Sequence, residues 1–139
     1  MNCTPLFKKA VQAGRSLNLV NEVQVNKILL QVAEAAIEKS AFILGENKKD
    51  LLRMPGSDPR YDRLMLTKSR IEAIAADIRK VAELPSPLGK VLSETTPPSG
   101  LKIRRISVPF GVVGIIYEAR PNVTFDVFSL CFKSGNACI

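Results

Sequence analysis

The sequence predicts an α/β fold in which N-terminal helices are followed by a β-hairpin and by the first βαβ unit of a parallel sheet. Apolar residues recur at helical spacing over residues 1–87, whereas residues 90–108 form two short strand-like stretches around the turn sequence TTPPSG. Residues 109–139 then read as strand, helix and strand. We therefore divide the chain into a helical part (1–87), a hairpin (90–108) and an incomplete βαβ unit (109–139).

The first two helices are indicated by their ends. Residues 4–13 have a helical pattern that we expect Gly14 to stop. Asn21 is suited to cap a long helix, with Gln24 completing a capping box. The apolar spacing carries this second helix to about Ile43.

Two more helices precede the hairpin. Asp58-Pro59 predicts the start of a short helix that runs through Leu66. Thr67 is suited to cap the next helix, which Pro85 ends. The apolar face of that helix consists of Ile71, Ile74, Ala75, Ile78, Val81 and Ala82.

The hairpin is predicted from two stretches, 90–93 and 101–108, on either side of the turn. The alternation of apolar residues changes phase at Arg104-Arg105. A β-bulge at that point accounts for the change. We expect one face of the hairpin to be exposed to water.

The C-terminal part has the order of a βαβ unit. Gly111 to Tyr117 is a continuous apolar run, which predicts a strand buried on both faces. Residues 121–133 predict a helix, with Pro121 in its first turn and Gly135 after its end. Residues 136–139 predict the start of the next parallel strand. Because Gly111 and Gly114 form no GxGxxG motif, we interpret them as positions of close packing.

Composition excludes several classes of protein. No apolar run approaches the length that spans a bilayer, and the N-terminus has no apolar core of a secretory signal. We therefore expect a cytoplasmic protein without membrane partners. The net charge of +7 fits solvated faces, attraction of anionic small molecules or nucleic-acid binding. Because the basic residues are scattered, we expect no nucleic-acid partner.

The chain has few candidates for catalysis. Without any histidine it contains neither a Ser-His-Asp triad nor a Cys-His pair, and no acidic cluster has metal-ligand spacing, so we expect no metal. Cys3, Cys131 and Cys138 lack CxxC spacing, and each is interpreted as a small buried side chain or a free thiol.

A polar cluster, Glu118 to Asn122, follows the predicted buried strand. Ligands of parallel sheets bind at this end of the strands. Arg120 offers a fork of donors for phosphate or carboxylate, and Asn122 offers an amide donor to a developing oxyanion. Two structural alternatives remain open: Asn122 is equally suited to cap the following helix, and Glu118 to form an ion pair with Arg120.

A family resemblance joins these residues. The stretch VPFGVVGIIYEARPNVTFDVFSLCFKSGNACI (108–139) closely resembles γ-glutamyl phosphate reductase, also called glutamate-5-semialdehyde dehydrogenase, of the aldehyde dehydrogenase superfamily. RLMLTKSRIEAIAADIRKVAELPSPLGKV (63–91) and KDLL (49–52) resemble it too. Members of the family are far longer, so the resemblance implies an N-terminal portion of the NADP-binding domain. It also implies that the hairpin resembles the oligomerisation arm and that the full-length form is a homo-oligomer.

The resemblance implies an oxidoreductase of proline biosynthesis. Family members use NADPH to reduce L-glutamyl 5-phosphate to L-glutamate 5-semialdehyde and phosphate, through a cysteine thiolate. It assigns Asn122 as the catalytic oxyanion donor and Tyr117, Glu118 and Ala119 to cofactor binding. Arg120 is assigned to substrate binding by its charge and position alone. Because the catalytic cysteine motif lies in the later half of the family, we expect this chain to be an inactive fragment. The alternative is a non-catalytic nucleotide-binding or assembly module of the same fold.

Overall fold

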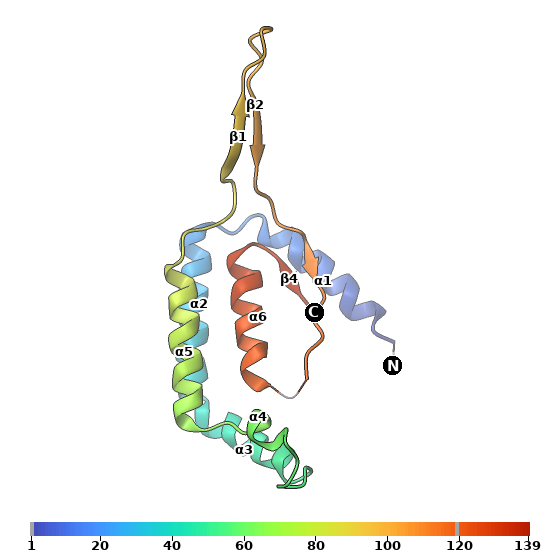
Figure 1. Ribbon diagram of the computed structural model, residues 1–139, viewed down its shortest axis with the longest axis vertical. Coiled ribbons are helices and arrows are strands. Elements are labelled where there is room, and N and C mark those ends of the chain that lie inside the picture. The colour runs from blue at the N-terminus through green and yellow to red at the C-terminus, as the bar shows by residue number, and fades with distance from the viewer. Residues whose placement is uncertain (1, 119) are drawn as a thin grey trace.

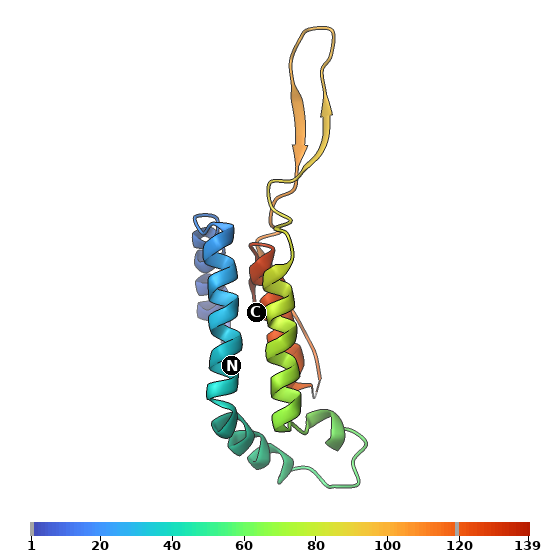
Figure 2. The same ribbon diagram turned by 90° about the vertical axis from the view of Figure 1, so that its left-hand side faces the viewer.

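The computed structural model describes residues 2–118 and 120–139 and has a mixed α/β architecture (Figure 1). Helices α2, α5 and α6 pack together as the body, the β1–β2 hairpin projects from one end, and α3 and α4 lie at the other (Figures 1 and 2). The elements are α1 (Thr4–Leu17), α2 (Glu22–Glu38), α3 (Ser40–Leu51), α4 (Tyr61–Leu64), α5 (Lys68–Glu83), β1 (Val91–Thr95), β2 (Ile103–Ile106), β3 (Val112–Val113), α6 (Pro121–Lys133) and β4 (Ala137–Cys138).

Helix α1 runs past the glycine that was expected to end it. The helix continues to Leu17, and Gly14 is a buried residue inside it. A Cβ atom at Gly14 would lie 3.4 Å from the backbone oxygen of Gly111 and 3.6 Å from the Cβ of Ala137. The predicted end at Gly14 is therefore wrong, because this glycine lets the helix approach β3 and β4 closely.

The capping box at the start of α2 is confirmed. The Asn21 side chain accepts a hydrogen bond from the Gln24 N–H (2.9 Å), and the Gln24 side chain accepts one from the Asn21 N–H (3.1 Å). The predicted extent of this helix to Ile43 is wrong, because Lys39 leaves helical geometry and a new helix, α3, starts at Ser40.

The direction of α3 is set by a buried asparagine. Asn47 donates a hydrogen bond to the Leu64 oxygen (2.9 Å) and accepts one from the Leu66 N–H (2.8 Å). These bonds hold α3 against the segment after α4. The short helix predicted from residue 58 to 66 contracts to Tyr61–Leu64, because the Asp58 side chain instead accepts a hydrogen bond from the Arg60 N–H (2.8 Å).

The core lies between α2, α5 and α6. Thr67 caps α5 as predicted, by accepting a hydrogen bond from the Arg70 N–H (3.2 Å). On α6, the rings of Phe128 and Phe132 stack with centroids 5.4 Å apart. The buried apolar residues of the cluster are Val25, Leu29 and Ala33 of α2 and Ile74, Ala75, Ile78 and Ala82 of α5, with phenylalanines of α6 packed against them.

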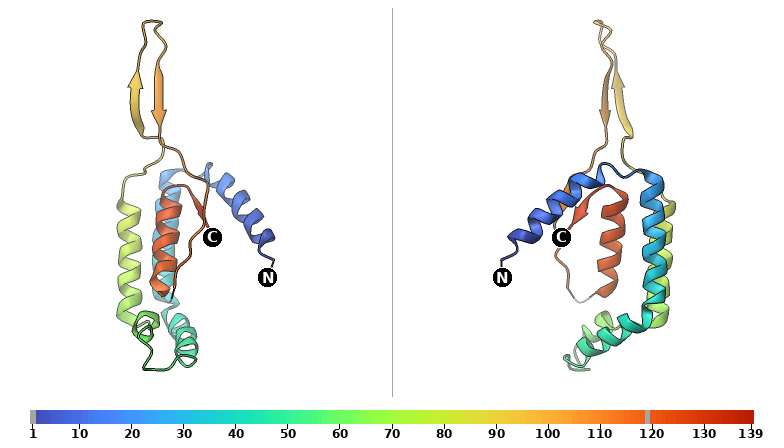
Figure 3. Two further views of the ribbon diagram at one scale, coloured as in Figure 1. Left: turned by 45° about the vertical axis from the view of Figure 1, so that its right-hand side comes forward. Right: turned by 180° about the vertical axis from the view of Figure 1, so that it is seen from behind.

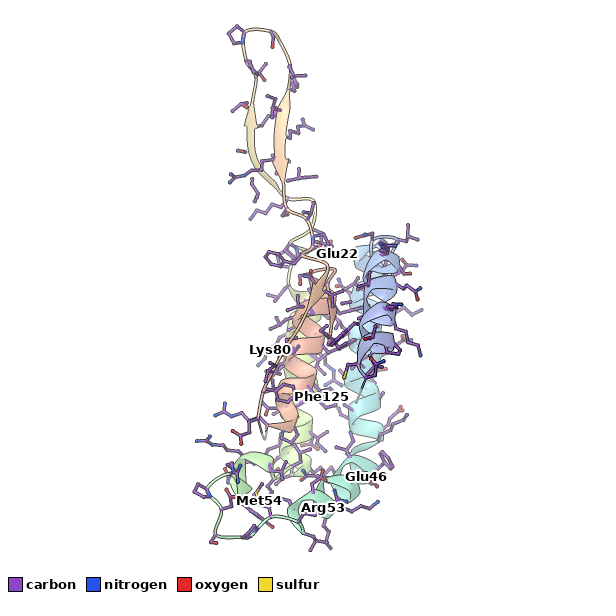
Figure 4. All side chains as sticks on the ribbon, turned by 90° about the vertical axis from the view of Figure 1, so that its right-hand side faces the viewer. Glu22, Glu46, Arg53, Met54, Lys80 and Phe125 are labelled. Carbon is purple, nitrogen blue, oxygen red and sulfur yellow. The ribbon has the colours of Figure 1, made fainter. Side chains whose placement is uncertain are left out.

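The hairpin stands clear of the body and is exposed on both faces (Figures 3 and 4). The expectation of a single exposed face is therefore wrong. Strands β1 and β2 pair antiparallel, and the register shifts between Val91 and Ser93. The extra residue is Leu92 on the first strand, whereas Arg104 and Arg105 both have regular partners on β1. The bulge exists, but its predicted placement on the arginine pair is wrong.

The βαβ unit forms with a shorter strand than predicted. Strand β3 pairs in parallel with β4, and the helix between them spans Pro121 to Lys133 as expected. Only Val112 and Val113 are assigned to β3, and the side chain of Ile116 is fully exposed. The expectation of a strand buried on both faces from Gly111 to Tyr117 is therefore wrong. Gly111 adopts a positive φ of 110°, so its backbone conformation, rather than close packing, requires glycine.

Residues 133–136, with the sequence KSGN, connect several elements through buried hydrogen bonds. The ammonium group of Lys133, whose side chain is 5% exposed, donates to the Asn26 side chain (2.6 Å) and to the Ala82 oxygen (3.0 Å). The Asn136 side chain accepts a hydrogen bond from the Gly111 N–H (2.9 Å). Between them, Gly135 has a φ of 70°. The motif thus joins α2, α5, α6 and the start of β3.

We predict opposite effects for the same substitution at two glycines. In Gly135→Ala, the Cβ would lie 2.8 Å from Cδ1 of Leu88 on a backbone of positive φ, so the free energy of unfolding should fall by about 2 kcal/mol. In Gly45→Ala, the new Cβ meets nothing within 4 Å inside α3, so stability should rise by up to ~1 kcal/mol. Urea titration followed by circular dichroism measures both, and equal effects would contradict the assignment.

We also predict that Lys133→Met destabilises the chain by about 3 kcal/mol, since it leaves buried oxygen acceptors without a donor. The matched control is Lys80→Met. Lys80 lies on the outer side of α5, and its side chain is 74% exposed (Figure 4). That variant should change the free energy of unfolding by less than ~0.5 kcal/mol. Equal urea midpoints for the two variants would show that the buried hydrogen bonds of Lys133 contribute little to the stability of the fold.

Candidate functional site

A pocket of about 320 Å³ lies between the N-terminus of α6 and the segment from α4 to α5. Both Arg120 and Asn122 line it, so the structure places two of the predicted site residues together. Part of the pocket lining is apolar and includes Leu66 and Ile74. The charged residues of the lining are Asp62, Asp77, Asp126, Arg63, Arg70 and Arg120.

Asn122 does not cap α6. The N-cap residue is Arg120, none of the described side chains caps this end, and Asn122 lies inside the first turn. Its amide donates a hydrogen bond to the Asp126 carboxylate over 3.3 Å. The capping alternative is therefore wrong. An amide has two N–H donors, so one remains for a ligand in the pocket.

The backbone of α6 adds to the attraction for anions. Uncapped N–H groups at a helix N-terminus carry partial positive charge. No acidic residue occupies the first turn of α6. Since the pocket lies at this end, an anionic ligand group is favoured there.

Glu118 pairs with a residue that sequence reasoning missed. Its carboxylate lies 3.0 Å from the guanidinium of Arg60, which also binds the Asp58 carboxylate (2.8 Å). Within residues 2–118 and 120–139, Glu118 forms no ion pair with Arg120, so that structural alternative is wrong. The hydrogen bonds from Arg60 lower the pKa of Asp58 to about 2 and raise the pKa of Arg60 itself. The loop before α6 is thus tied to the loop before α4.

Tyr117 turns back toward the helix. Its hydroxyl group forms a hydrogen bond with the hydroxyl of Thr124 in the first turns of α6. The side chain of Tyr117 is 47% exposed, so its ring remains accessible. Ala119, the third residue assigned to cofactor binding, lies outside the described residues.

Asp126 is a second residue that the sequence did not single out. It lies one helical turn after Asn122, and this i, i+4 spacing was the available signal. Burial, and secondly the charge of Asp77, raise the pKa of the Asp126 carboxyl group, while the bond from Asn122 lowers it. The folded chain therefore disfavours the bare negative charge at this position.

The cysteines lie away from this arrangement. Cys3, Cys131 and Cys138 are free thiols of intermediate burial, and none of them lines the pocket. Burial, followed by the neighbouring Cys138, raises the pKa of the Cys131 thiol. That shift opposes thiolate formation at Cys131. Among the described residues there is also no group of three potential metal-ligating side chains, and no helix has the length and hydropathy of a membrane span.

Known proteins resemble the chain throughout its length. No family model matches it. It is 59% identical to γ-glutamyl phosphate reductase of Bacteroides fragilis over 139 residues, which are 100% of this chain and 34% of that protein. The enzyme of the same name from Bacteroides thetaiotaomicron is also 59% identical, over 99% of this chain and 33% of that protein. The chain thus spans about a third of the length of these relatives.

Solved structures of the same enzyme have the same fold. The crystal structure from Thermotoga maritima matches with a TM-score of 0.89 and 34% identity, over 94% of this chain and 32% of that one. The crystal structure from Saccharomyces cerevisiae matches with a TM-score of 0.91 and 31% identity, over 99% of this chain and 36% of that one. By sequence and by fold, the chain is thus similar to an N-terminal portion of γ-glutamyl phosphate reductase.

Proposed function

We propose that the chain supplies the substrate-facing part of an NADPH-dependent, cytoplasmic reductase that converts L-glutamyl 5-phosphate to L-glutamate 5-semialdehyde and phosphate. The observation that carries this proposal is the 59% identity to the Bacteroides fragilis enzyme over all 139 residues. Residues 1–139 then form the N-terminal part of the NADP-binding domain. The resemblance to aldehyde dehydrogenases implies that the nucleophilic cysteine belongs to the later part of such an enzyme.

In this proposal the pocket holds the reacting acyl group. Attack of a thiolate on the acyl phosphate places negative charge on the carbonyl oxygen, and Asn122 donates its free N–H to that oxygen. Arg120 and the N-terminus of α6 bind the phosphate, which leaves with the electron pair of the broken C–O bond. The chain's contribution is therefore to position the substrate and stabilise charge, not to form the covalent bond.

The residues present fit only one end of the cofactor. NADPH, when bound, supplies the hydride for the reduction. The exposed ring of Tyr117 offers a surface for the nicotinamide, with Glu118 nearby as a polar neighbour. The carboxylate of Glu118 repels a pyrophosphate, and the chain has no GxGxxG motif for one. We therefore assign Tyr117 and Glu118 to the nicotinamide end.

The hairpin supports a homo-oligomeric full-length form. Its strands are exposed on both faces, and apolar side chains such as Ile103 and Ile106 are each 49% exposed. An exposed strand edge with apolar side chains is suited to pair with another sheet. We therefore propose that the hairpin serves as the oligomerisation arm.

A chimera tests the proposed function. Residues 1–139 replace the matching N-terminal third of the Bacteroides fragilis reductase, and NADP reduction by glutamate 5-semialdehyde and phosphate is followed by absorbance. We expect the chimera to be active and the 139-residue chain alone to show no turnover, since none of its cysteines lines the pocket. A folded but inactive chimera, or turnover by the chain alone, would contradict the proposal.

Within that chimera, Asn122→Ala should lower kcat by roughly 10²-fold, because one oxyanion donor is lost. The matched control is Asn18→Ala, at the exposed C-terminal end of α1. It removes the same amide outside the pocket and should leave kcat unchanged. Equal kcat values for the two variants would remove Asn122 from the proposed mechanism.

A further inference from the structure

Half of the charged side chains in the pocket already have partners. The guanidinium of Arg70 lies 3.0 Å from the Asp62 carboxylate and also donates to backbone oxygens of the α4–α5 segment. The Asp77 carboxylate lies 2.9 Å from the ammonium group of Lys80. Arg70, Asp62 and Asp77 therefore each have a partner of opposite charge within the protein.

Three charged groups in the pocket remain. They are the guanidinium groups of Arg63 and Arg120 and the carboxylate of Asp126. None of the three forms an ion pair with the residues that the structure describes. The pocket therefore offers a ligand two positive groups and one negative group.

This charge pattern is the complement of an α-amino acid whose side chain ends in an acyl phosphate. Glutamyl 5-phosphate carries two anionic groups, its α-carboxylate and its phosphate, and one cationic group, its α-ammonium. Accepting the reductase function proposed above, we infer that Asp126 binds the α-ammonium group of the substrate, while Arg120 and Arg63 bind its phosphate and α-carboxylate. Asp126 is then the residue that selects an α-amino acid over a simple dicarboxylic acid.

The spacing on α6 fits this assignment. Asn122 and Asp126 lie four residues apart, and such side chains have Cβ atoms about 5–6 Å apart on one helix face. In the substrate, four covalent bonds separate the reacting carbonyl carbon from the ammonium nitrogen, roughly 5 Å when extended. With Asn122 at the carbonyl oxygen, Asp126 thus lies where the ammonium group arrives.

The electrostatics of the pocket agree with a role of Asp126 in binding. Burial and the charge of Asp77 raise the pKa of the Asp126 carboxyl group. A bound ammonium group gives the Asp126 carboxylate an ion-pair partner, which the residues that the structure describes do not supply. A neutral amide at this position suits the unliganded fold at neutral pH, so Asp126→Asn should fold normally. Residues that bind ligands often reduce stability in this way.

The test compares two ligands that differ in one group. L-Glutamate, whose γ-carboxylate stands in for the acyl phosphate, and glutarate, which lacks the ammonium group, are titrated into the 139-residue chain and followed by NMR. The wild-type chain should bind L-glutamate roughly tenfold more tightly, because the ammonium forms a charge-assisted hydrogen bond. In Asp126→Asn this preference should disappear, while the affinity for glutarate stays equal or rises.

Asp50→Asn is the control, because Asp50 lies on α3 and pairs with Arg53 at the surface. It should retain the preference for L-glutamate, and urea titration confirms that both variants fold. Equal binding of the two acids by the wild-type chain, a preference that survives in Asp126→Asn, or no binding of either acid would each overturn the assignment of Asp126. The reductase function stands or falls separately, on the turnover of the chimera.

Discussion

The fold depends on one buried charge, the ammonium group of Lys133 at the end of α6. It reaches Asn26 of α2 and the Ala82 oxygen of α5, and Glu22 lies 3.7 Å away. A buried ammonium group is costly without partners, so the three helices fit together in the arrangement that supplies them. Glu22 lies where the hairpin leaves the body and also accepts a hydrogen bond from the Ser86 N–H (2.8 Å) (Figure 4). The same network therefore directs the chain from α5 toward the hairpin.

Holding one end of α6 places its other end at the pocket. Between the two ends, Phe125, Phe128 and Phe132 pack against the cluster of α2 and α5. The packing of these three phenylalanines fixes the rotation of α6 about its axis. As a result, Asn122 and Asp126 face the α4–α5 segment. The chain between β3 and α6 is held at a third point by the ion pair of Glu118 with Arg60. The buried contacts of the helices thus position the loop between β3 and α6, whose own residues are mostly exposed.

Local signals in the sequence were sufficient for several elements. Asn21 and Thr67 predicted helix starts because their capping bonds involve residues three positions away. Signals that depend on distant residues were not visible. Gly14 was interpreted as a helix end because glycine is common there. Its actual role is to let Gly111 approach closely, and this tertiary contact cannot be seen in the local sequence. The sequence pointed to Arg120 and Asn122 but missed Asp126, because the i, i+4 spacing of Asp126 from Asn122 gains its meaning only from the pocket that both residues line.

The two kinds of polar residue in the βαβ unit differ in what they contribute. Asn136 and Lys133 are almost fully buried, and their side chains form hydrogen bonds to the Gly111 N–H and to the Ala82 oxygen, respectively. Arg120 is exposed, and Asp126 is only partly buried and repelled by a neighbouring charge. Residues of the first kind cannot be exchanged without loss of the fold, because they would leave buried partners unsatisfied. Residues of the second kind contribute little to stability, so their arrangement is better explained by a ligand that completes it.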